Sequence, residues 1–370
     1  MLIPGVWAIG QFDSTKKFLS SQYKTKIPVY TQVITTIVHF LLCKWLIESK
    51  DMRETGAAIA TNVTYLLNMI ISDLWIRKNA NTEFKYMIFW YDKTVVQNLG
   101  QFLKIGIPGM LMLCFEWWAL ELLAIFAGLI GVEELACQVV VITIIGFIFM
   151  LPLGISYAAS ALTGNYIGEG KIDLAKKFAQ MTVFFNIICT TIIVVLLSVY
   201  QDAVSNVFTN EPKVIKIFNE TLWVLLIYIW FDTIHGVQSG IIRGMGRQVY
   251  GSVFTLICYY ILGMPLALLL CFKADMGIVG LWLGFTIASI ILDFGFCLII
   301  SCPNWNEISK KIRSQVDDGK DVPMTPEVRF VKKMLTPKQS PINHEGGYAL
   351  KGEYEEPNIN GEPLKRTSKL

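Results

Sequence analysis

The sequence has 370 residues, of which 54% are hydrophobic and only 16% are charged. An average soluble domain carries about 25% charged residues, so this composition excludes a soluble globular protein and indicates a bilayer as the main solvent. The net charge of +3 is small and widely spread, which argues against nucleic acid as a partner. The eight cysteines show no CxxC and no Cys/His ligand spacing, so we interpret them as packing or lipid-facing hydrophobes.

Apolar stretches divide most of the chain into predicted membrane spans. A spanning helix needs about 20 mostly apolar residues. Eight stretches satisfy this requirement: 27–47, 56–76, 105–130, 135–163, 181–200, 221–242, 249–272 and 276–302. The apolar residues 1–12 are too few for a span, and we interpret them as the second half of a helix whose beginning is missing. We therefore predict an all-α integral membrane protein, a polytopic helical bundle with eight full spans and a truncated first one.

The basic residues predict the orientation of these spans. Alternate connections carry 14 Lys and Arg on one side and six on the other, and the side with more positive charge is normally cytoplasmic. Residues 303–370 belong to the cytoplasmic side and hold seven of the 13 prolines together with many charges of both signs. Such a segment buries too little apolar surface to fold, so we predict a disordered cytoplasmic tail.

Five carboxylates inside predicted spans are candidates for function. They are Glu116, Glu121, Asp232, Asp293 and Asp73, although the place of Asp73 four residues before Arg77, near a cytoplasmic end, favours a snorkelling or ion-paired side chain. Each costs about 2.5 to 3.5 kcal/mol near a helix centre on insertion scales, which makes a functional role the default expectation. Glu116 and Glu121 lie about 140° apart around one helix, so they can flank a cavity without stacking. For Asp293 the sequence leaves open an interhelical hydrogen bond or a role in a site.

Aromatic and histidine side chains accompany two of these acids. Trp117 and Trp118 follow Glu116 and either form an aromatic wall for a lipophilic cation or only pack. His235 follows Asp232 by three residues, so it either shares the proton of Asp232 or is a satisfied histidine at a helix contact. Helix breakers are present too, because Pro108, Pro152 and Pro265 stand within spans, where proline permits a bend.

Three stretches resemble the MATE family of multidrug and toxic compound extrusion transporters, in particular its eukaryotic branch. They are IPGMLMLCFEWWALELLAIFAGLIG (107–131), MLPLGISYAASALTGNYIGEGKIDLAKK (150–177), and WFDTIHGVQSGIIRGMGRQVYGSVFTLICYYILGMPLALLL with the following GIVGLWLGF (277–285). These are similar to helices seven, eight and ten to twelve of the family. Two positions depart from the family pattern, Leu162 where Arg is frequent and Arg247 where an uncharged residue is usual.

The resemblance implies an organisation in two helical bundles. Residues 1–77 would be the remnant of the first bundle, 78–104 a cytoplasmic linker, 105–302 a complete six-helix second bundle, and 303–370 the tail. It also implies structural roles for a set of residues in the matching stretches: Pro108, Pro152, Gly164, Asn165, Gly240, Arg243, Gly244 and Pro265.

The resemblance further implies a secondary antiporter that extrudes organic cations in exchange for protons. Glu116, Glu121 and Asp232 would then bind the proton and the substrate, Trp117 would contact the substrate, and Glu134 would be a further acidic position, although its place beside Glu133 between spans favours a solvated loop acid. We expect no cofactor, with Na⁺ as the alternative coupling ion. Membrane lipid and small organic cations are the expected partners of a monomer. The plasma membrane or an acidic vesicle or vacuole is its expected location.

Other classes of function remain open at this point. A membrane-embedded enzyme is disfavoured because HExxH, GxSxG and a His and Asp acyltransferase set are all lacking. A flippase for lipid-linked saccharides would need basic rather than acidic cavity residues to bind phosphate. A family member that lacks most of the first bundle could also fail to transport, because alternating access uses two related halves.

Overall fold

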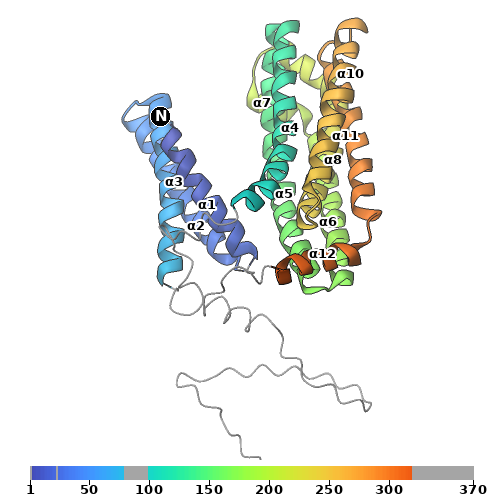
Figure 1. The fold of residues 1–370 in the computed structure, drawn as a ribbon. Coiled ribbons are helices and arrows are strands. Elements are labelled where there is room, and N and C mark those ends of the chain that lie inside the picture. The colour runs from blue at the N-terminus through green and yellow to red at the C-terminus, as the bar shows by residue number, and fades with distance from the viewer. Residues whose placement is uncertain (1, 22–23, 79–98, 319–370) are drawn as a thin grey trace, which may run out of the picture. The chain divides into compact units, whose positions relative to one another are not determined.

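The computed structural model describes residues 2–21, 24–78 and 99–318, and within these ranges it is helical without any strand. The first group of helices, drawn in blue in Figure 1, comprises α1 (Ile3–Ser21), α2 (Lys26–Lys44), the π-helical η1 (Trp45–Ser49) and α3 (Arg53–Lys78). The second group comprises α4 (Leu99–Ile130), α5 (Val132–Glu169), α6 (Ile172–Val199), α7 (Gln201–Phe208), α8 (Pro212–Gly244), α9 (Gln248–Leu256), η4 (Ile257–Gly263), α10 (Met264–Leu268), η5 (Leu269–Lys273), α11 (Gly277–Ser301) and α12 (Trp305–Asp318).

Eight helical segments among the described residues are long and apolar enough to cross a membrane. They coincide with the eight predicted spans, and α9, η4, α10 and η5 together form one of them, Gln248–Lys273. Helix α1 is not among the eight. It continues past the apolar residues 1–12 to Ser21, through polar residues such as Asp13 and Lys16. The all-α class with eight spans is therefore confirmed.

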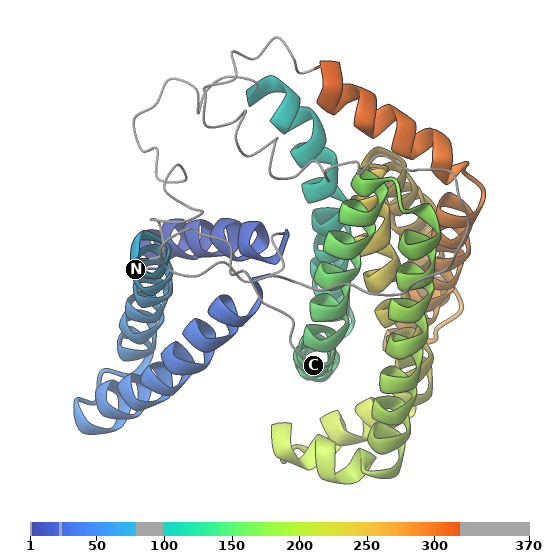
Figure 2. The same ribbon diagram turned by 90° about the horizontal axis from the view of Figure 1, so that it is seen from below.

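Helix α8 is the central element of the second group. It packs against α5, α6 and α11, and Figure 2 shows these helices gathered side by side. Its middle turns are buried almost without interruption from Tyr228 to Ile242. Hydrogen bonds fix it to α6, because Thr190 and Thr233 pair through their hydroxyls at 2.9 Å and Asn186 Nδ2 donates to the Thr233 carbonyl at 3.1 Å.

A row of glycines at four-residue spacing brings α8 close to α5. A side chain at Gly236 would press on the Phe149 ring, one at Gly240 would collide with the backbone of Ser156, and one at Gly244 would lie 2.6 Å from the Ser160 carbonyl oxygen. Because residues four apart share one helix face, these positions form a continuous strip without side chains. The strip lets the two backbones touch, as small residues do in membrane bundles.

The span 248–273 departs from regular α-helix at two places. The π-helical segments η4 and η5 flank the short α10, which has Pro265 in its first turn. Proline removes a backbone donor, and wide π turns inside helices are frequent at functional sites. By contrast, α4 and α5 continue as α-helices through Pro108 and Pro152.

The prediction of disorder for 303–370 is wrong for residues 305–318, which form α12. Trp305 is buried and donates from Nε1 to the Ile300 carbonyl at 2.9 Å, while Ser309 donates to the Ile167 carbonyl at 2.8 Å. Ile308 and Ile312 pack beside them. This apolar face at helical spacing orders a segment whose average composition is polar. Residues 79–98, in the predicted linker, and 319–370 lie outside the described residues.

Candidate functional site

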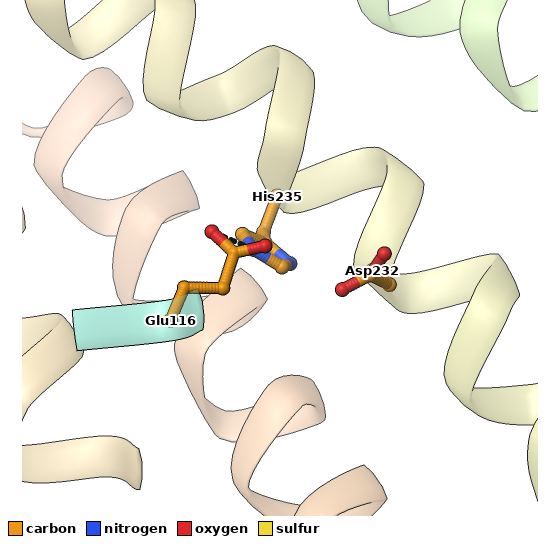
Figure 3. Close-up of side chains that lie close together, drawn as sticks. All are labelled: Glu116, Asp232 and His235. Carbon is orange, nitrogen blue, oxygen red and sulfur yellow. Dashed lines mark ion pairs between the residues drawn. The ribbon is translucent and has the colours of Figure 1, made fainter. Parts of the chain in front are cut away.

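An acid and a histidine from different helices meet inside the second group. Glu116 on α4 and His235 on α8 are 7% and 1% exposed, and Glu116 Oε2 lies 3.3 Å from His235 Nε2 (Figure 3). The turn of α4 that carries Glu116 is held in place by Tyr260 of η4, which donates to the Phe115 carbonyl at 3.1 Å. Both side chains are thus positioned by the bundle rather than by a loop.

The third member of the cluster is Asp232, one turn before His235 on α8. It is 2% exposed and accepts a hydrogen bond from the Tyr228 hydroxyl at 2.7 Å. Of the two alternatives that the sequence left open for His235, the structure shows the contact between helices, because the imidazole pairs with Glu116 and the Asp232 carboxylate with Tyr228.

Three polar groups converge here. Glu116, Asp232 and His235 each offer one atom that could ligate a cation, and these atoms all lie within 4.8 Å of one another. Groups at this spacing can share a proton or a bound water, and the spacing also suits a small cation. Because these groups are buried, gain or loss of a proton or cation changes the free energy of the site by several kcal/mol, the cost of an uncompensated charge in a low-dielectric interior.

Two narrow hollows adjoin the cluster. One is lined by Glu116 and Asp232 with Trp117 and Phe149. The other is lined by Glu116 and His235 with Ser239 and Arg243 among others. Each has room for about one water molecule. In this conformation the site is therefore of a size for protons and water.

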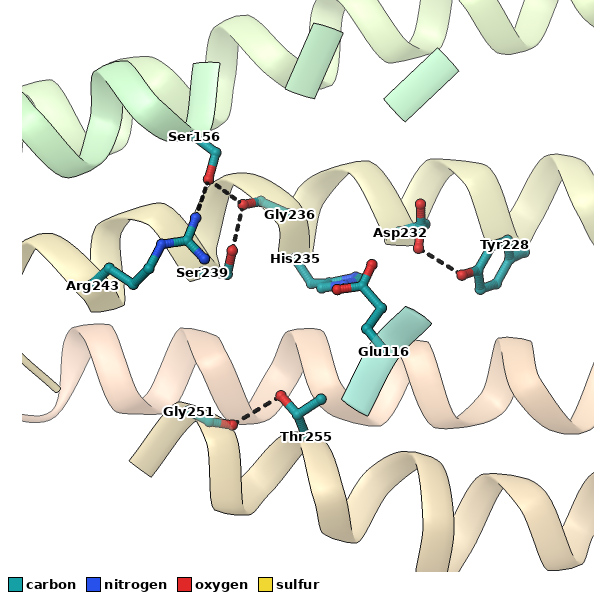
Figure 4. Close-up of polar contacts among 10 residues, drawn as sticks. All are labelled: Glu116, Ser156, Tyr228, Asp232, His235, Gly236, Ser239, Arg243, Gly251 and Thr255. Carbon is teal, nitrogen blue, oxygen red and sulfur yellow. Dashed lines mark hydrogen bonds and ion pairs between the residues drawn. The ribbon is translucent and has the colours of Figure 1, made fainter. Parts of the chain in front are cut away.

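A second set of polar contacts continues along α8, as Figure 4 shows. Ser156 of α5 donates to the Gly236 carbonyl at 2.7 Å and accepts from Arg243 Nη2 at 2.9 Å. Ser239 also donates to Gly236 O, at 2.7 Å. Arg243 thereby lines the hollow with a fixed positive charge, Glu116 of α4 lines the same hollow, and Asp232 lies further along α8.

The structure brings some of the predicted site residues together and leaves others apart. Glu116, Asp232 and Trp117 meet at one hollow. Trp117 packs edge to face on Phe149 with ring centroids 6.5 Å apart, and 37% of it is exposed. Trp118 is exposed and is not among the lining residues.

Glu121 and Glu134 are not in the cluster. Glu121 has an exposed side chain on another face of α4, as its angular separation of about 140° from Glu116 requires. Glu134 is half-buried in the first turn of α5, next to Glu133, which pairs with Lys213 at 3.0 Å. Both lie apart from the residues that line the two hollows.

The residues assigned structural roles by resemblance occupy helix contacts or helix interiors. Gly164 approaches the Gly244 carbonyl, since a side chain there would lie 3.4 Å from it, and Asn165 follows in α5, half-buried. Arg243 has a more direct place than predicted, because it lines a hollow together with Glu116. His235 is the functional candidate that the sequence did not select, and its position in WFDTIHG next to an intramembrane acid was the available signal.

Comparisons with known proteins agree with these features. The MatE family pattern matches residues 108–269. Over 323 residues the chain is 28% identical to Protein DETOXIFICATION 16 of Arabidopsis thaliana, covering 87% of this chain and 66% of the relative. It is also 28% identical over 315 residues to Multidrug and toxin extrusion protein 1 of Oryctolagus cuniculus, covering 85% of this chain and 55% of the relative. The chain thus spans 55% to 66% of the length of these two curated relatives.

Solved structures show the same fold. The eukaryotic MATE transporter AtDTX14 superposes with a TM-score of 0.80 at 26% identity, over 85% of this chain and 70% of that one. A MATE transporter of Vibrio cholerae, VcmN, has a TM-score of 0.73 at 17% identity, over 83% and 69%, and at that identity shows the fold alone. These solved proteins are transporters and not enzymes. Pattern, relatives and fold converge on the helices that carry Glu116, Asp232 and His235, and in all three respects the chain is similar to the multi-pass membrane proteins of the MATE family.

Proposed function

We propose that this protein extrudes organic cations or other xenobiotics across a membrane in exchange for protons. The observation that carries the proposal is the buried cluster of Glu116, Asp232 and His235, contributed by the two helices α4 and α8. Ionised carboxylates at this depth cost free energy unless a positive charge binds to them. An antiporter of this kind binds a proton and an organic cation in alternation.

The relatives support the direction of this proposal. Two of them are named for multidrug and toxin extrusion or for detoxification. Because the chain spans 55% to 66% of their length, transport activity, substrates and partners are proposed for this protein by analogy with longer proteins.

Competition between two ligands for the same acids would couple them. If protons and the cation bind the cluster in a mutually unfavourable way, loading one expels the other, and a gradient of protons then drives the cation out. His235 suits this exchange better than Lys or Arg, since an imidazole can be either neutral or positively charged. Glu116 therefore has a partner whose positive charge is not permanent.

The size of the hollows supports a proton-loaded conformation within the proposed cycle. Space for about one water molecule does not admit an organic cation. Binding the cation requires that the helices around the hollow separate. Trp117 borders the hollow and then offers a flat π face to the cation. A flat face imposes few geometric demands, so broad substrate choice follows.

The decisive experiment uses vesicles that contain the intact protein, an imposed pH gradient and a fluorescent organic cation such as ethidium. We expect gradient-driven ethidium movement, its loss in Glu116→Gln, and its retention in Glu121→Gln, the matched control on the exposed face of the same helix. A Na⁺ gradient in place of the pH gradient tests the alternative coupling ion. Equal movement in the wild-type protein and Glu116→Gln would refute the role of the cluster, and no movement in the wild-type protein would favour a chain that does not transport alone.

The location and orientation belong to the same proposal. The excess of basic residues on one side of the spans supports a cytoplasmic C-terminal tail, and organic cation export suits the plasma membrane or an acidic vesicle or vacuole. Membrane lipid and small cations are the proposed partners, and the proposed state is a monomer. Protease access to a C-terminal tag in sealed cells, before and after permeabilisation, tests the orientation.

A further inference from the structure

Asp293 is a buried acid that the cluster described above does not contain. It lies in α11, well inside a candidate span, and is 6% exposed. Neither of its carboxylate oxygens has a hydrogen-bond partner in the part of the chain that the structure describes, and no ion pair is formed there either. The interhelical hydrogen bond that the sequence left open is therefore not made. An ionised carboxylate so placed costs several kcal/mol unless a positive charge compensates for it.

The neighbours of Asp293 on its own helix show which way this face of α11 turns. Phe285, Ser289, Asp293 and Phe296 follow one another at spacings of four, four and three residues, so they share one face. Phe285 stacks on Tyr259 of η4 with ring centroids 4.6 Å apart. Phe296 lies edge to face with His235 at 6.3 Å. Asp293 stands between these two contacts and therefore on the side of α11 that meets α8 and η4.

The ionisable groups around Asp293 come from three elements. His235 and Asp232 of α8 interact with it electrostatically, and so does Tyr259 of η4. From α4, Glu116 reaches the same imidazole through its ion pair. Tyr228 of α8 is bonded to Asp232. Asp293 is thus the third acid around one histidine.

The permanent positive charges nearby are engaged elsewhere. Arg243 donates to Ser156, and Arg247 donates from Nη1 to the Ile299 carbonyl at 3.1 Å. If Glu116, Asp232 and Asp293 were all ionised, even a protonated His235 together with Arg243 would leave one negative charge in excess. A bundle interior does not tolerate such an excess, so one further proton or cation has to be present.

We infer that Asp293 is a third proton-carrying acid of this site, protonated in the conformation that the structure shows and deprotonated when an organic cation occupies the cluster. The O–H bond of its carboxyl breaks, the proton passes to water, and the positive charge of the incoming cation replaces it. The inference rests on the proposed function only for the identity of the cation that displaces the proton.

Infrared spectroscopy of the purified intact protein, labelled with ¹³C at the aspartate side-chain carboxyl, tests the protonation directly. We expect an aspartic acid C=O band at neutral pH that disappears in Asp293→Asn. Ser289→Ala is the matched control, since it removes an unpartnered buried hydroxyl one turn away without changing charge, and it should keep the band. Absence of the band from the wild-type protein, or persistence of the band in Asp293→Asn, would refute the inference.

A second variant covers the case in which Asp293→Asn does not fold. In Asp232→Asn, Asp293 is still present beside the cluster, so the band should persist, and its absence would overturn the inference. Ethidium added to the wild-type protein should weaken the band and release about one proton per ethidium bound, whereas an unchanged band with ethidium bound would refute the exchange. Vesicles that move no ethidium would defeat the proposed function alone, because the band is read without substrate.

Discussion

The imidazole of His235 faces the carboxylate of Glu116 at 3.3 Å, and neither side chain has appreciable contact with solvent. The two residues come from α8 and α4, so the pair joins two helices through a contact whose strength depends on protonation of the ring. A lysine or arginine in place of His235 would hold Glu116 permanently. With histidine, the same contact can be made and released as the ring gains or loses a proton.

This pair should be visible in the stability of the protein. His235→Leu leaves Glu116 buried without a partner, and we expect a loss of about 3 to 5 kcal/mol in the free energy of unfolding, the usual effect of breaking a buried pair. Glu116→Gln combined with His235→Leu should recover part of that loss. Thermal unfolding of the purified variants in detergent measures both. Additive effects of the two single substitutions would mean that the contact carries no coupling energy.

The two adjacent tryptophans of α4 should differ in their effect on substrate. Trp117→Ala removes an aromatic face that borders the hollow, and we expect the apparent affinity for ethidium to fall by about 3-fold to 30-fold, in line with about 0.5 to 2 kcal/mol for a cation and π contact. Trp118→Ala should leave the affinity unchanged, because that ring lies outside the hollow. Concentration dependence of uptake into vesicles provides the comparison. Equal losses of affinity in the two variants would show that both tryptophans affect ethidium binding through the stability of the fold and not through contact with the substrate.

The glycine strip of α8 predicts a sharp contrast between two alanine substitutions. Gly240→Ala places a methyl group on the Ser156 backbone and should destabilise the protein by about 1 to 3 kcal/mol, the usual effect of overpacking. Gly146→Ala is the matched control in α5, where an added methyl meets nothing within 4 Å. It should be neutral or stabilise by up to about 1 kcal/mol, since alanine favours helix. The melting temperatures of the two variants measure this difference, and similar values for both would contradict the close contact between α8 and α5.

Helix α12 should be anchored by one aromatic side chain. Trp305→Ala removes a side chain that is 4% exposed, and we expect a loss of about 3 to 5 kcal/mol from the contact of α12 with the bundle. Limited proteolysis after Lys310 or Lys311 should then accelerate by more than 10-fold. Lys310→Ala, on the exposed face, should leave cleavage after Lys311 unchanged. Wild-type cleavage rates in Trp305→Ala would show that α12 is held by other contacts.

The spans were readable from the sequence because hydropathy over about 20 residues is a strong signal. The meeting of Glu116 with Asp232 was implied by resemblance, and the structure brings both to one hollow. The partner of His235 was not readable. Spacing along one helix points only to neighbours on that helix, whereas Glu116 arrives from another one. The exposed position of Glu121 follows from its angle to Glu116, which the sequence did provide.

Two other features escaped the sequence for different reasons. Helix α12 was hidden because the composition of the whole tail is polar, although Trp305, Ile308 and Ile312 mark an apolar face over a short stretch. The π-helical turns η4 and η5 leave no periodic trace, and Pro265 between them is the one local sign of irregularity that we recognise. Hydropathy or composition averaged over a long stretch therefore predicts spans well, but it does not predict a short helix such as α12 or the π-helical turns.

The backbone contact between α5 and α8 has a mechanical consequence. With no side chains between Gly240 and Ser156, the interface has no compressible layer, and the hydrogen bond from Ser156 to Gly236 adds a fixed tether. The two helices then move together as one rigid unit. His235 directly precedes Gly236, so its imidazole is fixed to that unit. Any widening of the hollow beside the ring therefore requires that α4 or the irregular segment 248–273 moves away from it.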